Sequence, residues 1–148
     1  MSRRTLFILV LIGVGGLILL ADALIETDEE AIERLMEDCR KAALAGDSGK
    51  VLATLDPDAT AGGFVGSGPL EPRIRHFLDR VKGRLEAIHL GRDKIEVDGD
   101  EARGRWTVKV TLREKEPVRP VLLSAVVRYR RAPEGWRIRH IEAGTWHP

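Results

Sequence analysis

Acid–base chemistry is the reaction type that this sequence favours most directly, because it places a histidine near a carboxylate. His76 and Asp79 are three residues apart, so a helix would place them on one side, where the carboxylate could orient the imidazole. Arg75 and Arg80 flank the pair, which lies off the apolar stripe of its segment. A solvated contact between the two side chains is therefore the alternative to a catalytic pair.

Two further candidates for acid–base chemistry lie in the C-terminal third of the sequence. Tyr129 falls in phase with alternating apolar residues, and His140 shares the phase of Trp136, so we expect both to point inward. With Trp106 and Trp136 they could line a ligand pocket, where burial would shift the pKa of the imidazole or the phenol. The alternative is a structural role, with each polar tip at the rim of the pocket.

The remaining reactive residue types predict no metal site and no cofactor. Gly62–Gly68 is rich in glycine but lacks the Lys-Ser/Thr pair of a phosphate-binding loop, so we expect an irregular loop there. The histidines are too scattered to predict a metal site. The single cysteine, Cys39, excludes an intrachain disulfide and a thiolate cluster. Catalytic residues thus stay unassigned beyond the candidates above.

Basic side chains share one face of the strands predicted near the C-terminus. The residues expected on this basic sheet face are Arg103, Arg105, Lys109, Arg128, Arg130, Arg137 and Arg139. One interpretation is the ordinary solvated outer face of an antiparallel sheet. The other is attraction to an acidic partner: anionic lipid headgroups, an acidic polymer, or the acidic helical half of a second copy. Nucleic acid is not expected, because aromatic residues do not alternate with the basic ones.

The N-terminal segment predicts a membrane-spanning helix, because no charge occurs between Thr5 and Ala21. As a helix this run would be about 25 Å long, the short end of what spans a bilayer core. Arg3 and Arg4 precede it and acidic residues follow it, which predicts an N-terminus in the cytoplasm. We therefore predict a signal anchor or transmembrane helix over residues 1–25, single-pass in the cell membrane, with the domain outside.

Cleavage of this segment is the alternative. Ala21-Asp22-Ala23 satisfies the small-x-small rule of a signal peptidase site, so the domain could be secreted or periplasmic after cleavage near Ala23. The apolar run is slightly longer than the usual signal core and ends without a Gly or Pro break, which favours the anchor. Both alternatives place the rest of the chain outside the cytoplasm.

Helices are predicted to follow the membrane segment. Apolar residues recur at helical spacing over residues 28–45, where Thr27 or the next residue can cap the start and Gly46 can end the helix. A short helix is expected over 48–55 and another over 72–87. The apolar faces of these helices need another layer to cover them.

Strands are predicted for the rest of the chain, because the apolar period changes from 3.6 to 2 near Ile88. Asp98-Gly99-Asp100 is a hairpin signal, and breaks follow at Glu116-Pro117 and at Ala132–Gly135. Four antiparallel strands after a run of helices predict an α+β domain. A composition of 43 % apolar and 32 % charged residues is an ordinary globular mixture, which excludes wholesale disorder.

Two stretches of the sequence carry characteristic turn and packing motifs. The first is Ala45-Gly46-Asp47 followed by the leucine-containing stretch 51–59, and the second is 126–131, a turn and 135–142. In these stretches the chain resembles the nuclear transport factor 2-like superfamily, in particular its SnoaL-like (polyketide-cyclase-like) branch, over about residues 28–144. Because the motifs are patterns of packing, they point to a fold and specify no reaction.

The resemblance implies a cone, in which a strongly curved antiparallel sheet wraps over helices and leaves a pocket inside its open end. The superfamily includes isomerases, dehydratases, epoxide hydrolases, cyclases and many non-catalytic domains, and its members frequently dimerise through the sheet. We therefore predict a membrane segment over 1–25 and a SnoaL-like α+β cone domain over 26–148.

The predicted function is a membrane-tethered, extracytoplasmic, non-catalytic module that binds a ligand or a protein. The alternative is a SnoaL-like enzyme, of isomerase, dehydratase or hydrolase type, acting on a small apolar molecule by acid–base chemistry. The predicted partners are the lipid bilayer through the N-terminal helix, a second copy through the sheet, and a small apolar ligand.

Overall fold

The computed structural model of the chain describes residues 3–24, 26–63, 66–113 and 121–145. The helices are α1 (Arg3–Leu24), α2 (Asp28–Leu44), α3 (Ser48–Ala53) and α4 (Leu70–Val81). The strands are β1 (Leu55–Gly63), β2 (Gly68–Pro69), β3 (Leu85–Asp98), β4 (Glu101–Leu112), β5 (Val121–Ala132) and β6 (Gly135–Thr145). The predicted break at Glu116-Pro117 lies outside the described residues. The predicted α+β class is confirmed.

Helix α2 forms where the apolar period and the capping residues predict it. The hydroxyl of its N-cap, Thr27, accepts the backbone N–H of Glu30, and the Glu30 carboxylate accepts the backbone N–H of Thr27. This reciprocal capping box satisfies two donors that a helix start leaves free. After the helix, Gly46 adopts a φ of 71°, a conformation that glycine reaches without steric cost. Ile32 and Met36 on α2 are buried in the core.

Helix α4 is shorter than the sequence predicts. The apolar period predicts a helix over 72–87, but α4 ends at Val81 and Gly83 turns the chain with a φ of 75°. Leu85 then begins β3 and pairs with Leu112 of β4. The prediction is wrong beyond Val81, because a left-handed glycine ends a helix and pairing with β4 directs the following residues into the sheet.

The sheet is mixed, which corrects the predicted set of four antiparallel strands. Its order is β2-β1-β6-β5-β4-β3, and β1 runs parallel to β6 while the other neighbouring pairs are antiparallel. Strand β1 occupies part of the segment predicted as an irregular loop. Its Ala, Gly and Pro residues have little strand propensity, so pairing with β6 and burial of Ala59 and Ala61 determine its conformation.

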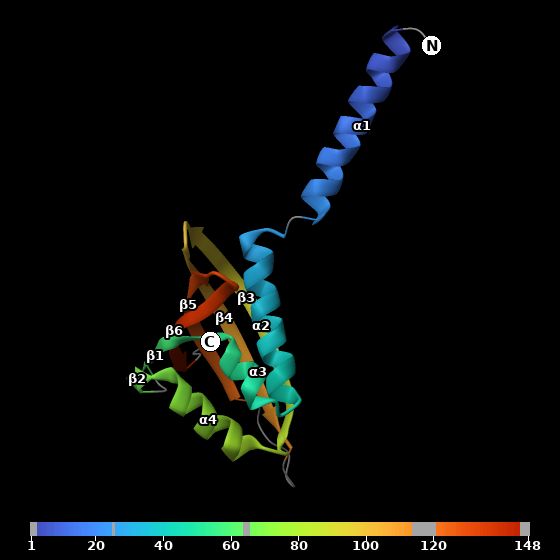
Figure 1. The fold of residues 1–148 in the computed structure, drawn as a ribbon. Helices are drawn as coiled ribbons and strands as arrows, with labels where there is room; N and C mark the ends of the chain where they lie inside the picture. The colour runs from blue at the N-terminus through green and yellow to red at the C-terminus, as the bar shows by residue number, and fades with distance from the viewer. Residues whose placement is uncertain (1–2, 25, 64–65, 114–120, 146–148) are drawn as a thin grey trace.

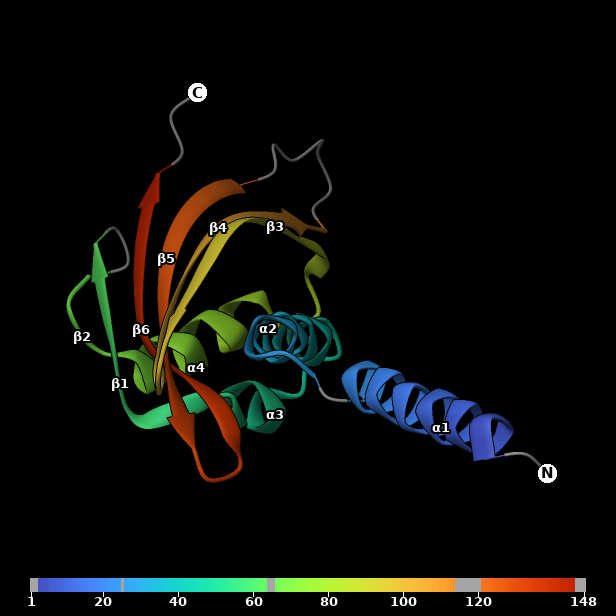
Figure 2. The same ribbon diagram turned by 90° about the horizontal axis from the view of Figure 1, so that it is seen from above.

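The helices α2, α3 and α4 lie on one side of the sheet (Figure 1), and strands β3 to β6 curve over α2 and α4 (Figure 2). This arrangement confirms the cone-like fold that the resemblance implies. The face of the sheet toward the helices, the inner face, contributes side chains such as Trp106 and Tyr129 to the core. The opposite face, called the outer face below, carries the exposed side chains of the same strands, such as Arg103 and Arg128.

Helix α1 extends away from the rest of the molecule in both views (Figures 1 and 2). Its large apolar side chains from Leu6 to Ile18 are between 50 % and 70 % exposed. Within the residues that the structure describes, no helix has the length and apolar character needed to cross a membrane. A helix is therefore present where the sequence predicts one, whereas the predicted membrane span over 1–25 is not confirmed.

Candidate functional site

The aromatic residues predicted to line a pocket are packed in the core. Trp106, Tyr129 and Trp136 lie on β4, β5 and β6, and their exposed fractions are 4 %, 1 % and 7 %. The indole Nε1 of Trp106 donates a 2.8 Å hydrogen bond to the hydroxyl oxygen of Tyr129. The indole Nε1 of Trp136 donates a 3.3 Å bond to a carboxylate oxygen of Asp28. Each polar tip thus has a partner in the chain, as the structural alternative for these residues requires.

Gly104 provides the space for the Trp106–Tyr129 pair. A Cβ atom at Gly104 would lie 2.6 Å from Nε1 of Trp106 and 3.3 Å from Cε2 of Tyr129. The first distance is far below van der Waals contact, so a side chain here would displace the hydrogen-bonded pair. Periodicity alone does not reveal this role, because the close approach depends on how two rings on neighbouring strands are placed.

Burial raises the pKa of Tyr129 well above its ordinary value, and the hydrogen bond from Trp106 offsets only part of that rise. The phenol therefore stays neutral at physiological pH. Efficient general acid–base catalysis needs a group whose pKa lies near the working pH, which Tyr129 does not offer. In the described part of the chain, every buried side-chain nitrogen or oxygen has a hydrogen-bond partner.

His140 lies on the outer face, so the prediction that it points inward is wrong. The β5–β6 ladder shifts register between Arg128, which pairs with His140, and Tyr129, which pairs with Ile138. Arg139 is the extra residue of this β-bulge. Because one extra residue reverses the alternation of a strand, His140 leaves the face that Ile138 occupies.

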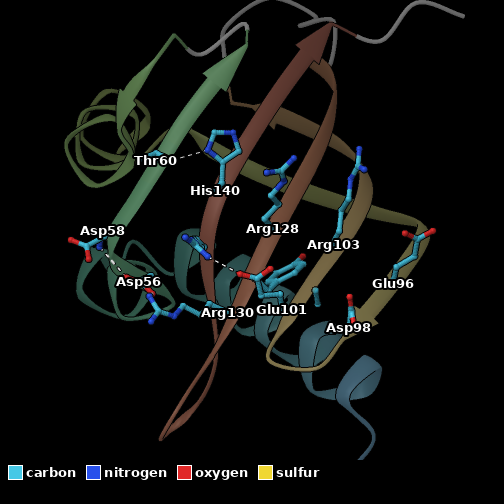
Figure 3. Close-up of a pocket in the computed structure, with 13 residues that line it drawn as sticks. Asp56, Asp58, Thr60, Glu96, Asp98, Glu101, Arg103, Arg128, Arg130 and His140 are labelled. Atoms are coloured by element: carbon cyan, nitrogen blue, oxygen red, sulfur yellow. Dashed lines mark hydrogen bonds and ion pairs between the residues drawn. The ribbon is translucent and has the colours of Figure 1, made fainter.

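One residue from each of five neighbouring strands forms a line across the outer face, which we call the outer row (Figure 3). In register order, the outer row consists of Thr60 on β1, His140 on β6, Arg128 on β5, Arg103 on β4 and Glu96 on β3. The Oγ1 of Thr60 lies 2.7 Å from Nδ1 of His140, a hydrogen bond that orients the imidazole. No sequence signal marks Thr60 or Glu96, because their position depends on the register of the whole sheet.

The outer row lines an open cavity of about 750 Å³, which we call the outer basin. The other charged residues around the outer basin are Asp56, Asp58, Asp98, Glu101, Arg130 and Arg139. Figure 3 shows the side chains of Arg103, Arg128 and His140 next to one another, directed away from the helices. The basin therefore combines a central group of nitrogen donors with carboxylates around it.

The arginines at one end of the outer basin are paired with carboxylates of the same chain. Nη1 of Arg130 lies 3.9 Å from Oδ2 of Asp56, and Nη1 of Arg139 lies 2.9 Å from Oε1 of Glu101. Asp56, near the start of β1, is joined to β5 in this way. These pairs are the ordinary ion contacts of a solvated sheet face.

Three other members of the predicted basic sheet face lie outside the outer basin. Nη1 of Arg105 lies 3.8 Å from a carboxylate oxygen of Asp93. Nη1 of Arg137 donates a 2.7 Å hydrogen bond to the carbonyl oxygen of Ala53, at the end of α3. Lys109 is exposed on β4. The predicted face is thus present, but most of its arginines have partners within the chain.

Arg103 and Arg128 are the exception on this face. They are register partners on β4 and β5, so their Cβ atoms lie about 5 Å apart. Among the residues described in the structure, neither forms a hydrogen bond or an ion pair. Glu96 is next to Arg103 in the outer row, but its carboxylate lies 2.8 Å from Nζ of Lys94. That hydrogen bond is the main cause that lowers the pKa of Glu96, and the charge of Arg103 contributes less.

The remaining candidates do not come together. His76 and Asp79 are exposed on α4, and in the described ranges they form no hydrogen bond with each other. The described residues contain no group of three or more His, Cys, Asp or Glu side chains that could hold a metal ion. Burial raises the pKa of the Cys39 thiol, which makes the reactive thiolate scarcer.

Known structures share this fold. An NTF2-like protein with a cystatin-like fold from Novosphingobium aromaticivorans is 20 % identical, with a TM-score of 0.68 over 89 % of this chain and 86 % of that one. A ketosteroid isomerase-like protein from Erwinia carotovora atroseptica is 15 % identical, with a TM-score of 0.66 over 84 % of this chain and 100 % of that one. A candidate dehydratase of the NTF2-like family from Streptomyces avermitilis is 16 % identical, with a TM-score of 0.65 over 80 % of this chain and 96 % of that one.

A comparison with curated protein sequences finds no match. The profile of the SnoaL-like domain matches residues 26–142, which include every residue of the outer row. The solved structures agree on the fold at low sequence identity and differ in the activities that their names suggest. The chain therefore belongs to the SnoaL-like domain family of the nuclear transport factor 2-like fold.

Proposed function

We propose that this chain is a membrane-tethered, extracytoplasmic SnoaL-like module that binds a ligand at the outer basin without catalysing a reaction. The observation that carries the proposal is the contrast between the two sides of the sheet. On the inner face, the polar tips of Trp106, Tyr129 and Trp136 are bonded within the chain. On the outer face, an open cavity of about 750 Å³ presents Arg103 and Arg128 next to each other.

The placement of the acid–base candidates supports a binding role over a catalytic one. Tyr129 is buried and neutral, and its hydroxyl accepts the bond from Trp106. His76 and Asp79 are exposed on a helix surface, where water screens and solvates both groups. A catalytic acid or base needs a defined substrate position within hydrogen-bond reach. His76 and Asp79 do not line the outer basin, and Tyr129, which lines it together with His140, has its hydroxyl bonded to Trp106.

The tether and the location outside the cytoplasm rest on the N-terminal segment. The run from Thr5 to Ala21 is uncharged, with Arg3 and Arg4 before it. The side chains described between Leu6 and Ile18 are apolar and exposed around the helix, and burial in a lipid environment would remove that apolar area from water. The charge order supports an N-terminus in the cytoplasm.

Topology is tested by cysteine labelling, because the chain has one native cysteine that can be removed by Cys39→Ala. Lys109 is exposed on the sheet and makes a suitable position for a single Lys109→Cys label. We expect a membrane-impermeant maleimide to label it in intact spheroplasts. Labelling that occurs only after lysis contradicts the proposed location. A mass showing that the mature chain begins near Leu24 would indicate a secreted protein and would contradict the tether.

An enzyme acting on a small apolar molecule is the alternative function. His140 favours it among the catalytic candidates, because its ring lines the outer basin and is oriented by Thr60. The names of two structural neighbours, a ketosteroid isomerase-like protein and a candidate dehydratase, refer to reactions of this type. Chemical conversion of a bound compound, lost in His140→Ala, would establish this alternative.

A ligand-observed NMR screen with the full-length chain in an uncharged detergent separates the two functions. The probes are small phosphates, carboxylates, ammonium compounds and apolar ketones. We expect at least one polar probe to bind, to be lost in His140→Ala, and to be kept in His76→Ala, the matched exposed histidine on α4. Unchanged probe spectra after overnight incubation support binding alone. Absence of polar binders, or equal losses in both variants, contradicts the proposal.

Dimerisation through the sheet competes with this role. A second copy seated on the outer face would cover the outer row and exclude a ligand from it. Loss of probe binding as the protein concentration rises, together with a doubled mass in analytical ultracentrifugation, would assign the outer face to a dimer instead.

A further inference from the structure

We infer that the outer basin binds the phosphate group of a small polar compound, with Arg103 and Arg128 as the two charged anchors and His140 as a third donor. The inference rests on the proposed binding role of the basin and names the class of ligand. It draws on the charges and contacts of the outer row, on the orientation of His140, and on the carboxylates around the cavity.

The pairing of Arg103 with Arg128 is the first argument. Like charges directly opposite each other on neighbouring strands destabilise a sheet, by roughly a few tenths of a kcal/mol when exposed. Arg130 and Arg139, which also line the basin, each have a carboxylate partner. In the part of the chain that the structure describes, Arg103 and Arg128 have none. A bound anion would turn this repulsive contact into a shared attraction.

The orientation of His140 is the second argument. Thr60 Oγ1 lies 2.7 Å from Nδ1 of His140, and in the tautomer in which the hydroxyl donates this bond the ring carries its proton on Nε2. Nε2 can then donate to a ligand in the basin, and Arg128 is the register partner of His140 on β5. The ring lies against β1, because a Cβ at Gly62 would be in van der Waals contact, 3.4 Å, with Nε2 and Cε1 of His140.

The charge of the site favours phosphate over a carboxylate. Two guanidinium groups supply two fixed positive charges and planar sets of N–H donors, which suit the several oxygens of a phosphate monoester. Such a group carries about −1.5 to −2 charges near pH 7, whereas a carboxylate carries one. A carboxylate supplies a single charge for the two guanidinium groups, and Glu96, the neighbour of Arg103 in the outer row, is paired with Lys94.

The carboxylates around the basin indicate which other chemical groups the ligand carries. Asp58 and Asp98 line the cavity, and in the described residues their carboxylates have no cationic partner. These negative charges oppose a broad anionic surface or polymer lying across the outer face. They suit hydroxyl or ammonium groups a few bonds away from the phosphate. The expected ligand is therefore compact and carries both kinds of group.

Isothermal titration calorimetry with inorganic phosphate tests the inference on the full-length chain in an uncharged detergent at constant ionic strength. We expect Arg103→Gln and Arg128→Gln each to weaken phosphate binding by about 10- to 100-fold, the usual effect of removing a charged hydrogen-bond donor. Arg105→Gln is the matched control, because Arg105 is an exposed arginine on the same face of β4 that does not line the outer basin. Its binding constant should stay within about twofold.

Two results overturn the inference. One is absence of saturable phosphate binding to the wild-type chain, and the other is equal weakening by Arg105→Gln and Arg128→Gln, which indicates general charge attraction. If either occurs while a different polar probe still binds through His140, the phosphate assignment fails and the proposed binding role remains. Circular dichroism of each variant confirms that the fold is retained, since all three arginines are exposed.

Nanodiscs distinguish a lipid headgroup from a soluble compound as the source of the phosphate. The full-length chain is placed in phosphatidylcholine discs with phosphatidic acid or, as a control, with enough phosphatidylglycerol to give the same surface charge. Weaker binding of added phosphate in the phosphatidic acid discs alone assigns the site to a monoester headgroup. Equal binding in both discs assigns it to a soluble phosphate compound.

Discussion

Strands β4 and β5 carry two very different pairs of side chains on their opposite faces. On the inner face, Trp106 donates to Tyr129 and the two rings share a space that Gly104 keeps free. On the outer face, Arg103 and Arg128 are direct register partners, without a carboxylate to bond either of them among the described residues. The first pair satisfies its own polar groups, whereas the second requires water or a ligand to do so. This difference separates the structural face from the binding face.

The largest expected effect on the free energy of unfolding comes from removing the Trp106–Tyr129 pair on the inner face. Trp106→Ala removes a side chain that is 4 % exposed and leaves the Tyr129 hydroxyl without its donor, so we expect a loss of about 3–5 kcal/mol in the free energy of unfolding. Arg105→Ala, on the outer face of the same strand, should change it by less than about 0.5 kcal/mol. Urea denaturation measures both, and similar losses in the two variants would remove the distinction between the faces.

The variant Gly104→Ala should also lower the stability of the folded protein, because it adds a side chain on the inner face. A Cβ at 2.6 Å from Trp106 Nε1 forces the aromatic pair to shift, and overpacking of this kind costs about 1–3 kcal/mol. Gly91→Ala is the matched control on β3, because its Cβ would meet Thr107 at an ordinary 3.6 Å. Thermal unfolding of both variants checks the prediction, and equal melting temperatures would show that the pair adapts freely.

High pH should destabilise the protein through Tyr129. Burial raises the pKa of Tyr129 in the folded state, so above about pH 10 the unfolded chain releases a proton that the folded chain keeps. The contribution of Tyr129 to the free energy of unfolding is therefore fully present below about pH 10. Above that pH it decreases by up to about 1.4 kcal/mol per pH unit. Tyr129 is the only tyrosine, so tyrosinate absorbance should appear together with unfolding. Ionisation near pH 10 in the folded protein would contradict the packed inner face.

The smallest expected effect lies on the outer face. Without a bound anion, Arg128→Gln relieves the repulsion from Arg103 and should raise the free energy of unfolding by a few tenths of a kcal/mol at low salt. Added phosphate should stabilise the wild-type chain more than the variant, because the native state of the variant binds it more weakly. Destabilisation by Arg128→Gln in the absence of phosphate would assign Arg128 a structural role instead.

The sequence predicts the inner face well and the outer basin poorly. Helix α2 follows from its apolar period and caps, and the burial of Trp106, Tyr129 and Trp136 follows from strand alternation. Strand β1 cannot be predicted in this way, because its small residues form a strand only when β6 pairs with it. Local patterns therefore predict the elements that can be read from a single segment.

The outer row depends on contacts that no single segment contains. A bulge at Arg139 turns His140 to the outer face, and strict alternation cannot show a bulge. Asp56 pairs with Arg130 although the two residues are far apart in the chain, so the sequence cannot separate paired from unpaired arginines. The basic face was predictable, and the position at which its charges remain uncompensated was not.

Side-chain NMR during a phosphate titration tests the division between the two faces most directly. In the full-length chain, we expect the imidazole signals of His140 and the Nε–Hε signals of Arg103 and Arg128 to shift with a common binding constant. The indole signal of Trp106 should stay in place, because its hydrogen bond to Tyr129 is buried on the other face. A titration that moves the Trp106 indole while the outer row remains unchanged would contradict the account.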